Sequence, residues 1–188
     1  MKRIFILEHL EKRVWKWCRI EYKHISEIIG KNNLWFTNIK RKNKYLENLG
    51  KTFKKKASEL NLTKVCILDP NAKKELTPKE AEKFKYFIFG GILGDYPPKK
   101  RTKKELPLFK GAEKRNLGKG QFPTDNAFYV TKQIIKGKKI SDLKFQNKFI
   151  LKLNEFASIT LPFKYVLVNN QPLIRKEIIT YLKRKRGF

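Results

Sequence analysis

A segment rich in glycine and proline follows one of the most apolar runs of the chain. Residues 86–89 predict a buried strand, and the next nine residues, 90–98, read Gly-Gly-Ile-Leu-Gly-Asp-Tyr-Pro-Pro. A glycine lacks a Cβ, so backbone amide and carbonyl groups can approach a ligand closely, and the prolines fix the direction in which the chain leaves. The segment therefore predicts a ligand-binding loop. A valine in place of Gly91 is expected to exclude the ligand while leaving the protein folded.

Glu8 and His9 are a second pair of candidates, because they follow the apolar run 3–7. This run predicts a buried strand, and ligands of open α/β sheets gather at the carboxyl ends of the strands. A carboxylate at that edge can orient a cationic substrate, so Glu8 is a candidate site residue. For His9 we expect a packing role or a position at the start of a helix.

Several common enzyme classes lack their motifs here. Glu8-His9-Leu10 follows the first run where a dinucleotide-binding domain would have GxGxxG, and no GxxxxGK[ST] phosphate loop occurs. The chain has only two histidines and no serine elbow, so a nucleophilic hydrolase is poorly supported. Cys18 and Cys66 form no CxxC pair, which argues against a zinc site or a disulfide framework. We expect no metal, and we expect Cys66 to be a small buried side chain.

Strand and helix patterns alternate along most of the chain. Strands are predicted at 3–7, 34–39, 65–68, 86–89 and 112–117, and helices at 14–29, at 40–60, from Thr77, at 125–136 with Thr124 as its cap, and at 172–184. Alternation of this kind specifies an α/β domain with a mainly parallel sheet and flanking helices. We see no internal repeat and no linker, so residues 1–188 are expected to form a single domain.

The charge is strongly unbalanced. The 45 lysines and arginines exceed the 17 acidic residues by 28, which is far more than solubility requires. A lysine-rich surface of a thermophilic protein would normally be balanced by glutamate, so a polyanionic neighbour such as RNA or a ribosome is favoured. The basic residues of 40–60 are one plausible contact for phosphates.

No apolar run is long enough to form a transmembrane helix, and Met1-Lys2-Arg3 leads into a run too short for a signal peptide. From these patterns we expect no membrane association and a cytoplasmic protein.

Several motifs in the same order resemble one family. The run FGGILGDYPPKKRT that begins at Phe89, the Leu68-Asp69-Pro70 before it and the segment 124–127 after it resemble SPOUT-class methyltransferases related to the eukaryotic protein-arginine methyltransferase. The segments 6–9 and 161–167 fit as well, so the resemblance spans nearly the whole chain. It implies a C-terminal trefoil knot, which periodicity alone could not predict.

The resemblance also implies that S-adenosylmethionine binds in a bent shape among three loops, which follow Leu68, Phe89 and Leu117, and leaves as S-adenosylhomocysteine. The residues that would bind it are Leu68, Asp69, Pro70, Phe89, Gly90, Gly91, Leu93, Gly94, Leu117, Gly118, Thr124 and Ala127.

The acceptor that the family implies is an arginine of a ribosomal protein. A guanidinium is almost always protonated and prefers paired carboxylate oxygens, and Glu8, Asp95 and Asp125 are the acids near the expected pocket. We expect Asp95 and Glu8 to orient the guanidinium and accept its proton.

Two alternatives remain open. An RNA methyltransferase of the SPOUT class would use the basic segment 99–104 and Arg115 to contact phosphates. A non-catalytic RNA-binding or ribosome-assembly factor could also retain the fold. The sequence leaves open whether the protein is a monomer or a homodimer.

Overall fold

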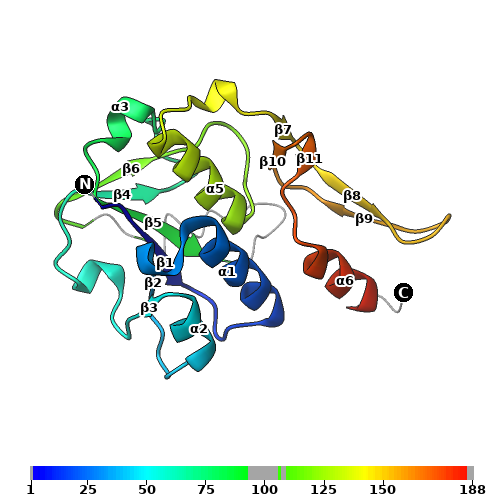
Figure 1. Ribbon diagram of the computed structural model, residues 1–188, viewed down its shortest axis with the longest axis horizontal. Coiled ribbons are helices and arrows are strands. Elements are labelled where there is room, and N and C mark those ends of the chain that lie inside the picture. The colour runs from blue at the N-terminus through cyan, green and yellow to red at the C-terminus, as the bar shows by residue number, and fades with distance from the viewer. Residues whose placement is uncertain (1, 93–105, 107–108, 186–188) are drawn as a thin grey trace.

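A six-stranded parallel sheet forms the centre of the computed structural model, which describes residues 2–92, 106 and 109–185. Its order is β3-β2-β1-β5-β4-β6, and every pair is parallel (Figure 1). The strands are β1 (Ile4–His9), β2 (Leu34–Thr37), β3 (Lys51–Thr52), β4 (Val65–Leu68), β5 (Tyr86–Gly91) and β6 (Ala112–Arg115). The predicted α/β class with a mainly parallel sheet is confirmed, while the knot stays a prediction.

Helices flank this sheet, and small antiparallel sheets follow it. The helices are α1 (Lys16–Ile29), α2 (Lys44–Leu49), α3 (Pro78–Ala81), α5 (Thr124–Ile135) and α6 (Lys176–Lys185), with 3-10 turns η1 (Lys31–Asn33), η2 (Ala57–Glu59) and η3 (Ile140–Asp142). The later strands are β7 (Phe145–Gln146), β8 (Phe149–Lys152), β9 (Ser158–Leu161), β10 (Tyr165–Val168) and β11 (Gln171–Pro172). Strands β11, β10 and β7 form one sheet and β8 pairs with β9. Figure 1 shows these elements and α6 beside the main sheet.

Both faces of the main sheet are buried, which explains why its strands are almost continuously apolar. Phe5 and Leu7 of β1 point toward the face that α1 and α5 cover, where Phe128 of α5 stacks on Phe89 with ring centroids 3.8 Å apart. Ile4 and Ile6 point to the opposite face, where loop residues cover them. Figure 1 shows α1 and α5 side by side on the first face.

The predicted helix over 14–29 is confirmed as α1, with its start at Lys16, and its apolar stripe is buried. Cys18, Tyr22, Ile25 and Ile29 are all buried, and Gly30 ends the helix with a φ of 87°. Such a positive φ is where glycine costs least, because other residues have a Cβ that opposes it. Cys66, predicted to be buried, is fully buried in β4.

The predicted helix over 40–60 is wrong. Within this range only the six residues of α2 are α-helical, and Ala57–Glu59 forms the 3-10 turn η2, because Gly50 closes α2 with its amide on the Leu46 carbonyl at 3.0 Å. A Cβ on Gly50 would lie 2.5 Å from the carbonyl oxygen of Leu34. The chain therefore passes close to β2 and continues as β3, because pairing with a sheet edge outweighs a weak helix propensity.

Two predicted helix starts also differ. Thr124 is the first residue of α5 and not its cap, since Pro123 occupies the cap position without a side-chain hydrogen bond. The last helix begins at Lys176 instead of residue 172, because Gln171 and Pro172 pair with β10. Thr77, by contrast, caps α3 as predicted, accepting a hydrogen bond from the Glu80 amide at 3.2 Å.

The two glycines at the end of β5 lead to a first prediction. A Cβ on Gly91 would lie 2.6 Å from Leu7 Cδ2 and 2.7 Å from the Tyr22 hydroxyl, so it would meet the core and not a ligand. Contrary to the expectation from the sequence, a larger residue at Gly91 should therefore destabilise the folded protein. Gly91→Ala should lower the free energy of unfolding by about 1–3 kcal/mol through overpacking, as measured by urea denaturation.

Gly90→Ala is the matched control. Its Cβ would lie 3.2 Å from Ile92 Cδ1, the far end of a flexible side chain that can move. A smaller loss of stability is expected there, and equal losses in the two variants would contradict the packing argument.

Candidate functional site

The carboxyl ends of β1 and β5 lie next to each other at the centre of the sheet. Glu8 pairs in register with Gly90 and His9 with Gly91, and the Leu10 amide donates to the Gly91 carbonyl at 3.2 Å. From β1 the chain runs outward through β2 to β3, whereas β5 lies on the other side of β1. Ligands of open α/β sheets bind at such a reversal of strand order, so this edge is the candidate site.

Glu8 lies at this edge with only 2% of its surface exposed. Its Oε2 accepts hydrogen bonds from the Ala57 amide at 2.6 Å and from Thr37 Oγ1 at 3.1 Å. Burial raises the pKa of the Glu8 carboxyl above its usual value, and these two hydrogen bonds oppose the rise. A carboxyl with a raised pKa is a better proton acceptor than one that is fully solvated.

His9 has the packing role that we expected. Its Nδ1 lies 2.9 Å from the Tyr22 hydroxyl, its backbone carbonyl accepts a hydrogen bond from Asn38 Nδ2 at 2.7 Å, and its ring is buried. Burial lowers the pKa of His9, so the neutral ring is favoured. The contact with Tyr22 fixes the end of β1 against α1.

The three loops that the resemblance singled out begin side by side, because β5, β4 and β6 are neighbours in the sheet. After β4, the Asp69 carboxylate binds Lys114 Nζ at 3.0 Å and accepts from the Asn71 amide at 2.9 Å, while Leu68 is buried and Pro70 exposed. Asp69 therefore stabilises its own turn. After β5, Phe89 packs on Phe128 of α5.

The loop after β6 also begins at this edge. Leu117 is buried, and Gly118 has a φ of 81° and donates its amide to Asn116 Oδ1 at 2.8 Å. This turn needs glycine because of its positive φ. Thr124 and Ala127 lie in the first turn of α5, which follows the same loop. Leu93, Gly94 and Asp95 lie outside the described residues, as do residues 99–104.

The proposed phosphate contact of Arg115 is wrong. Its side chain is 3% exposed, and its guanidinium pairs with Glu80 and with Glu113, the latter at 2.7 Å. Its charge also lies over the ring of Phe84, 5.2 Å from the centroid. The charge of Arg115 is therefore already neutralised by two carboxylates, which leaves it no role as a phosphate contact.

A buried polar cluster close to this edge went unnoticed in the sequence. His24 Nδ1 lies 2.7 Å from Asp125 Oδ2, and Glu21 of α1 is nearby and also buried. Burial, and then the charge of Asp125, raises the pKa of Glu21 to about 8 against a hydrogen bond from Trp17. The signal was available, since Glu21 and His24 lie within the apolar stripe of α1.

Asn126, next in sequence, joins the C-terminal elements to this cluster. Its Oδ1 accepts from the Val166 amide of β10 and its Nδ2 donates to the Leu173 carbonyl, both at 2.9 Å. The side chain is fully buried and satisfied at both ends. One amide therefore fixes β10 and the segment before α6 against the start of α5.

The described residues contain neither a metal-binding cluster nor a helix that could span a membrane. Within residues 2–92, 106 and 109–185, no group of three or more His, Cys, Asp and Glu side chains is arranged to bind a metal ion. In that same part of the chain, every helix is too short or too polar to cross a bilayer.

Comparison with known proteins gives one consistent match. A sequence profile of the family described as "Protein arginine N-methyltransferase SFM1-like" matches residues 4–187. Protein arginine N-methyltransferase SFM1 of Saccharomyces cerevisiae is 32% identical over 204 residues, which cover 96% of this chain and 94% of the yeast protein. The resemblance seen in the motifs is thereby confirmed.

Solved structures of yeast SFM1 agree with this family match. The yeast SFM1 structure complexed with SAM gives a TM-score of 0.90 over 100% of this chain and 93% of that chain, at 32% identity. The yeast SFM1 structure complexed with SAH gives a TM-score of 0.86 over 96% of this chain and 94% of that chain, at the same identity. Trm10 of Thermococcus kodakaraensis, 21% identical, gives 0.51 over 74% of this chain and 96% of that one, which shows a shared fold alone.

The buried carboxyl of Glu21 predicts a pH dependence of stability. Folded Glu21 keeps its proton up to about pH 8, whereas the unfolded carboxyl loses it near 4.5, so folding binds a proton between these values. Stability should therefore fall as pH rises through this window, by up to about 1.4 kcal/mol per pH unit for one proton. Glu21→Gln should remove this contribution, as measured by urea denaturation at pH 5, 6.5 and 8.

Glu155→Gln makes the same substitution at an exposed position and should leave the wild-type slope of the free energy of unfolding against pH. If the free energy of unfolding of Glu21→Gln depended on pH as steeply as that of the wild type, the Glu21 carboxyl would not be the group that binds the proton.

Proposed function

Because this chain belongs to the SFM1-like family of protein arginine N-methyltransferases, we propose that it transfers a methyl group from S-adenosylmethionine to an arginine of a ribosomal protein. The observation that carries the proposal is the match to yeast SFM1 in complex with SAM, which extends over the whole chain at a TM-score of 0.90. A ribosomal acceptor implies a cytoplasmic setting.

The chain's own groups at the carboxyl edge suit the cofactor. The adenosyl part of S-adenosylmethionine needs backbone donors and acceptors beside apolar side chains. The ends of β5, β4 and β6 lie side by side here, and Leu68 and Leu117 are buried. Gly118 in the loop after β6 and Gly90 near the end of β5 are partly exposed and have no Cβ that would obstruct a ligand. When bound, the cofactor supplies a methyl group on a positively charged sulfur.

Acidic groups of this chain would hold the acceptor. The planar guanidinium prefers carboxylate oxygens, and removal of one of its protons makes a nitrogen electron-rich. That nitrogen forms its bond to the methyl carbon as the carbon–sulfur bond breaks, and the proton passes to a carboxylate. We assign this role to Glu8 and Asp95. The raised pKa and the position of Glu8 beside Gly90 support the first assignment.

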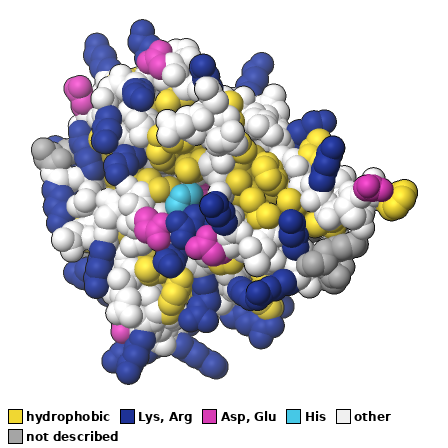
Figure 2. Space-filling model, turned by 45° about the vertical axis from the view of Figure 1, so that its right-hand side comes forward, with side chains coloured by type: hydrophobic (Ala, Val, Ile, Leu, Met, Phe, Trp, Pro, Cys, Tyr) yellow, Lys and Arg dark blue, Asp and Glu magenta, His cyan; other side chains and the backbone are white. Residues whose placement is uncertain are grey.

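The charge of the surface supports a ribosomal substrate. A net charge of +28 favours approach to a particle rich in RNA, and a protein acceptor within such a particle would select a basic enzyme surface. Figure 2 shows lysines and arginines spread over one face of the molecule, with hydrophobic side chains gathered near its centre, where a histidine, acidic groups and basic groups lie together. RNA fits the basic residues around this centre.

A label-transfer experiment tests the proposal. The protein is incubated with radiolabelled S-adenosylmethionine and ribosomal subunits or their precursors, and protein is then separated from RNA. We expect label in one ribosomal protein, recovered as methylarginine after hydrolysis. Label in RNA would identify an RNA methyltransferase of the same fold, and failure to bind either S-adenosylmethionine or S-adenosylhomocysteine in calorimetry would identify a non-catalytic factor.

Conservative amide variants test the two carboxylates. Glu8→Gln and Asp95→Asn should each reduce the rate constant of methyl transfer by about 100-fold or more, as loss of a general base does. Their affinity for S-adenosylmethionine, measured by calorimetry, should stay at the wild-type value. Glu155→Gln is the control and should transfer methyl groups normally. A Glu8→Gln variant with full activity but reduced stability would show that Glu8 only fixes the turn at Ala57.

A further inference from the structure

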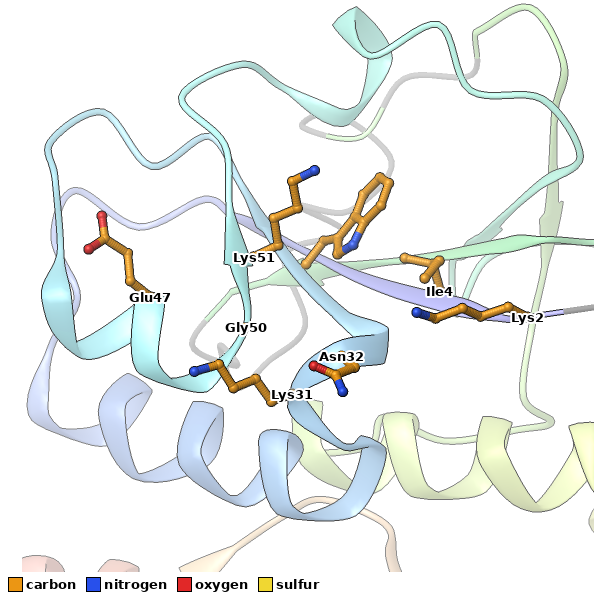
Figure 3. A pocket seen from close by; sticks show the side chains of 8 residues that line it. Lys2, Ile4, Lys31, Asn32, Glu47, Gly50 and Lys51 are labelled. Atoms are coloured by element: carbon orange, nitrogen blue, oxygen red, sulfur yellow. The ribbon is translucent and has the colours of Figure 1, made fainter.

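An open pocket lies at the amino ends of the strands, on the edge of the sheet opposite to the candidate site. Its volume is about 460 Å³, within the range of pockets that hold small ligands. It is lined by Lys2, Ile4, Lys31, Asn32, Trp35, Glu47, Gly50 and Lys51 (Figure 3). These residues come from β1, η1, β2, α2 and β3 and the chain just before β1, so the fold assembles the pocket from distant segments.

The lining is basic. Lys2, Lys31 and Lys51 outnumber the one acid, Glu47, and Figure 3 shows the three lysines on different sides of the pocket. All three lysines are exposed, and within the described part of the chain none of them forms an ion pair. Ammonium groups that surround a pocket without carboxylate partners create a positive potential that attracts an anion.

An aromatic side chain lies beside these charges. Trp35 of β2 is half-buried and packs against Phe53 and Tyr86, with ring centroids at 4.9 Å and 5.6 Å. Lys51 Nζ lies over the same indole, 5.5 Å from its centroid. The neighbouring rings hold the indole in place, so it needs little ordering to receive a flat ligand.

We propose that this pocket binds single-stranded RNA, with Lys31, Lys51 and Lys2 on phosphates and Trp35 beside a base. Proteins that bind single strands combine a basic groove with aromatic rings on which bases stack, and this pocket has both features. A base must leave the duplex to enter it, so a double helix fits poorly. An acidic peptide would use the lysines but not the indole.

The inference rests on the proposed function only for the identity of the RNA, which would be ribosomal. It is tested by measuring RNA binding, with no methyl transfer involved. The pocket and the cofactor loops lie at opposite edges of the sheet, so RNA at one edge leaves the other accessible. The site would dock the enzyme on rRNA near the acceptor protein. Failure of methyl transfer and failure of this site are thus separate results.

The first test measures the affinity of a fluorescent 12-nucleotide oligouridine by anisotropy. The double variant Lys31→Ala/Lys51→Ala should bind about 25-fold more weakly at 0.1 M salt, and the slope of log K against log salt should flatten by about 1.4, since each single-strand phosphate contact contributes about 0.7. Lys148→Ala/Lys152→Ala removes the same charge from exposed positions around β8 and should change affinity much less.

Equal losses in the two double variants would overturn the proposal, because charge alone would then explain binding. Lys31→Arg/Lys51→Arg keeps the charges and should bind as the wild type does. Binding by this variant would show that these positions tolerate substitution and that the alanine pair loses affinity through its missing charges. S-adenosylmethionine affinity should be unchanged in the alanine pair, as the two edges are separate.

The second test uses tryptophan emission. The chain has three tryptophans, and oligouridine should quench the emission of the wild type and of Trp15→Phe. Trp35→Phe keeps an aromatic ring in the packing but should lose most of this quenching. Inorganic polyphosphate, which has charge but no base, should cause little quenching. Equal quenching by polyphosphate, or full quenching in Trp35→Phe, would overturn the assignment to RNA.

Discussion

The parallel pairing of β1 with β5 is the constraint on which the rest of the structure depends. All six residues of β1 are buried, and all six pair with β5. Because both faces of this pair are covered, it must be apolar throughout, and only its last residues can be polar. Glu8 and His9 are those residues, and each is satisfied by a partner from another segment: Glu8 by Thr37 and Ala57, His9 by Tyr22.

The cost of burying polar groups determines how the later elements attach. Asp125 and Asn126 lie buried in the first turn of α5, where an unpaired polar group would cost about 1–3 kcal/mol. His24 satisfies the carboxylate, and Val166 and Leu173 satisfy the amide. The C-terminal strands are therefore held against the main sheet by hydrogen bonds as well as by apolar contacts. Glu21 is buried beside Asp125, and burial and then that charge raise its pKa.

The two edges of the sheet differ in chemistry. The carboxyl edge brings together loops, buried acids and glycines, as suits a cofactor and a cationic acceptor. The amino edge brings together lysines and an aromatic cluster around Trp35, as suits an anion with a flat base. Separate edges allow an enzyme to hold a large particle at one place and act on a side chain at another.

The local sequence pattern alone predicted several of the strands and helices of this protein, and its family. The apolar runs fixed β1, β4 and β5, the three- and four-residue spacing fixed α1, and the order of motifs identified the family, because each of these signals is carried by neighbouring residues. Tertiary structure decided what depends on distant partners. Arg115 is buried because Glu80 lies over it, Gly91 faces Leu7 rather than a ligand, and residue 50 ends a helix because β2 lies close by. Glu21 meets Asp125, and Lys2 joins Lys31 and Lys51, only after the chain has folded, since no spacing in the sequence relates them.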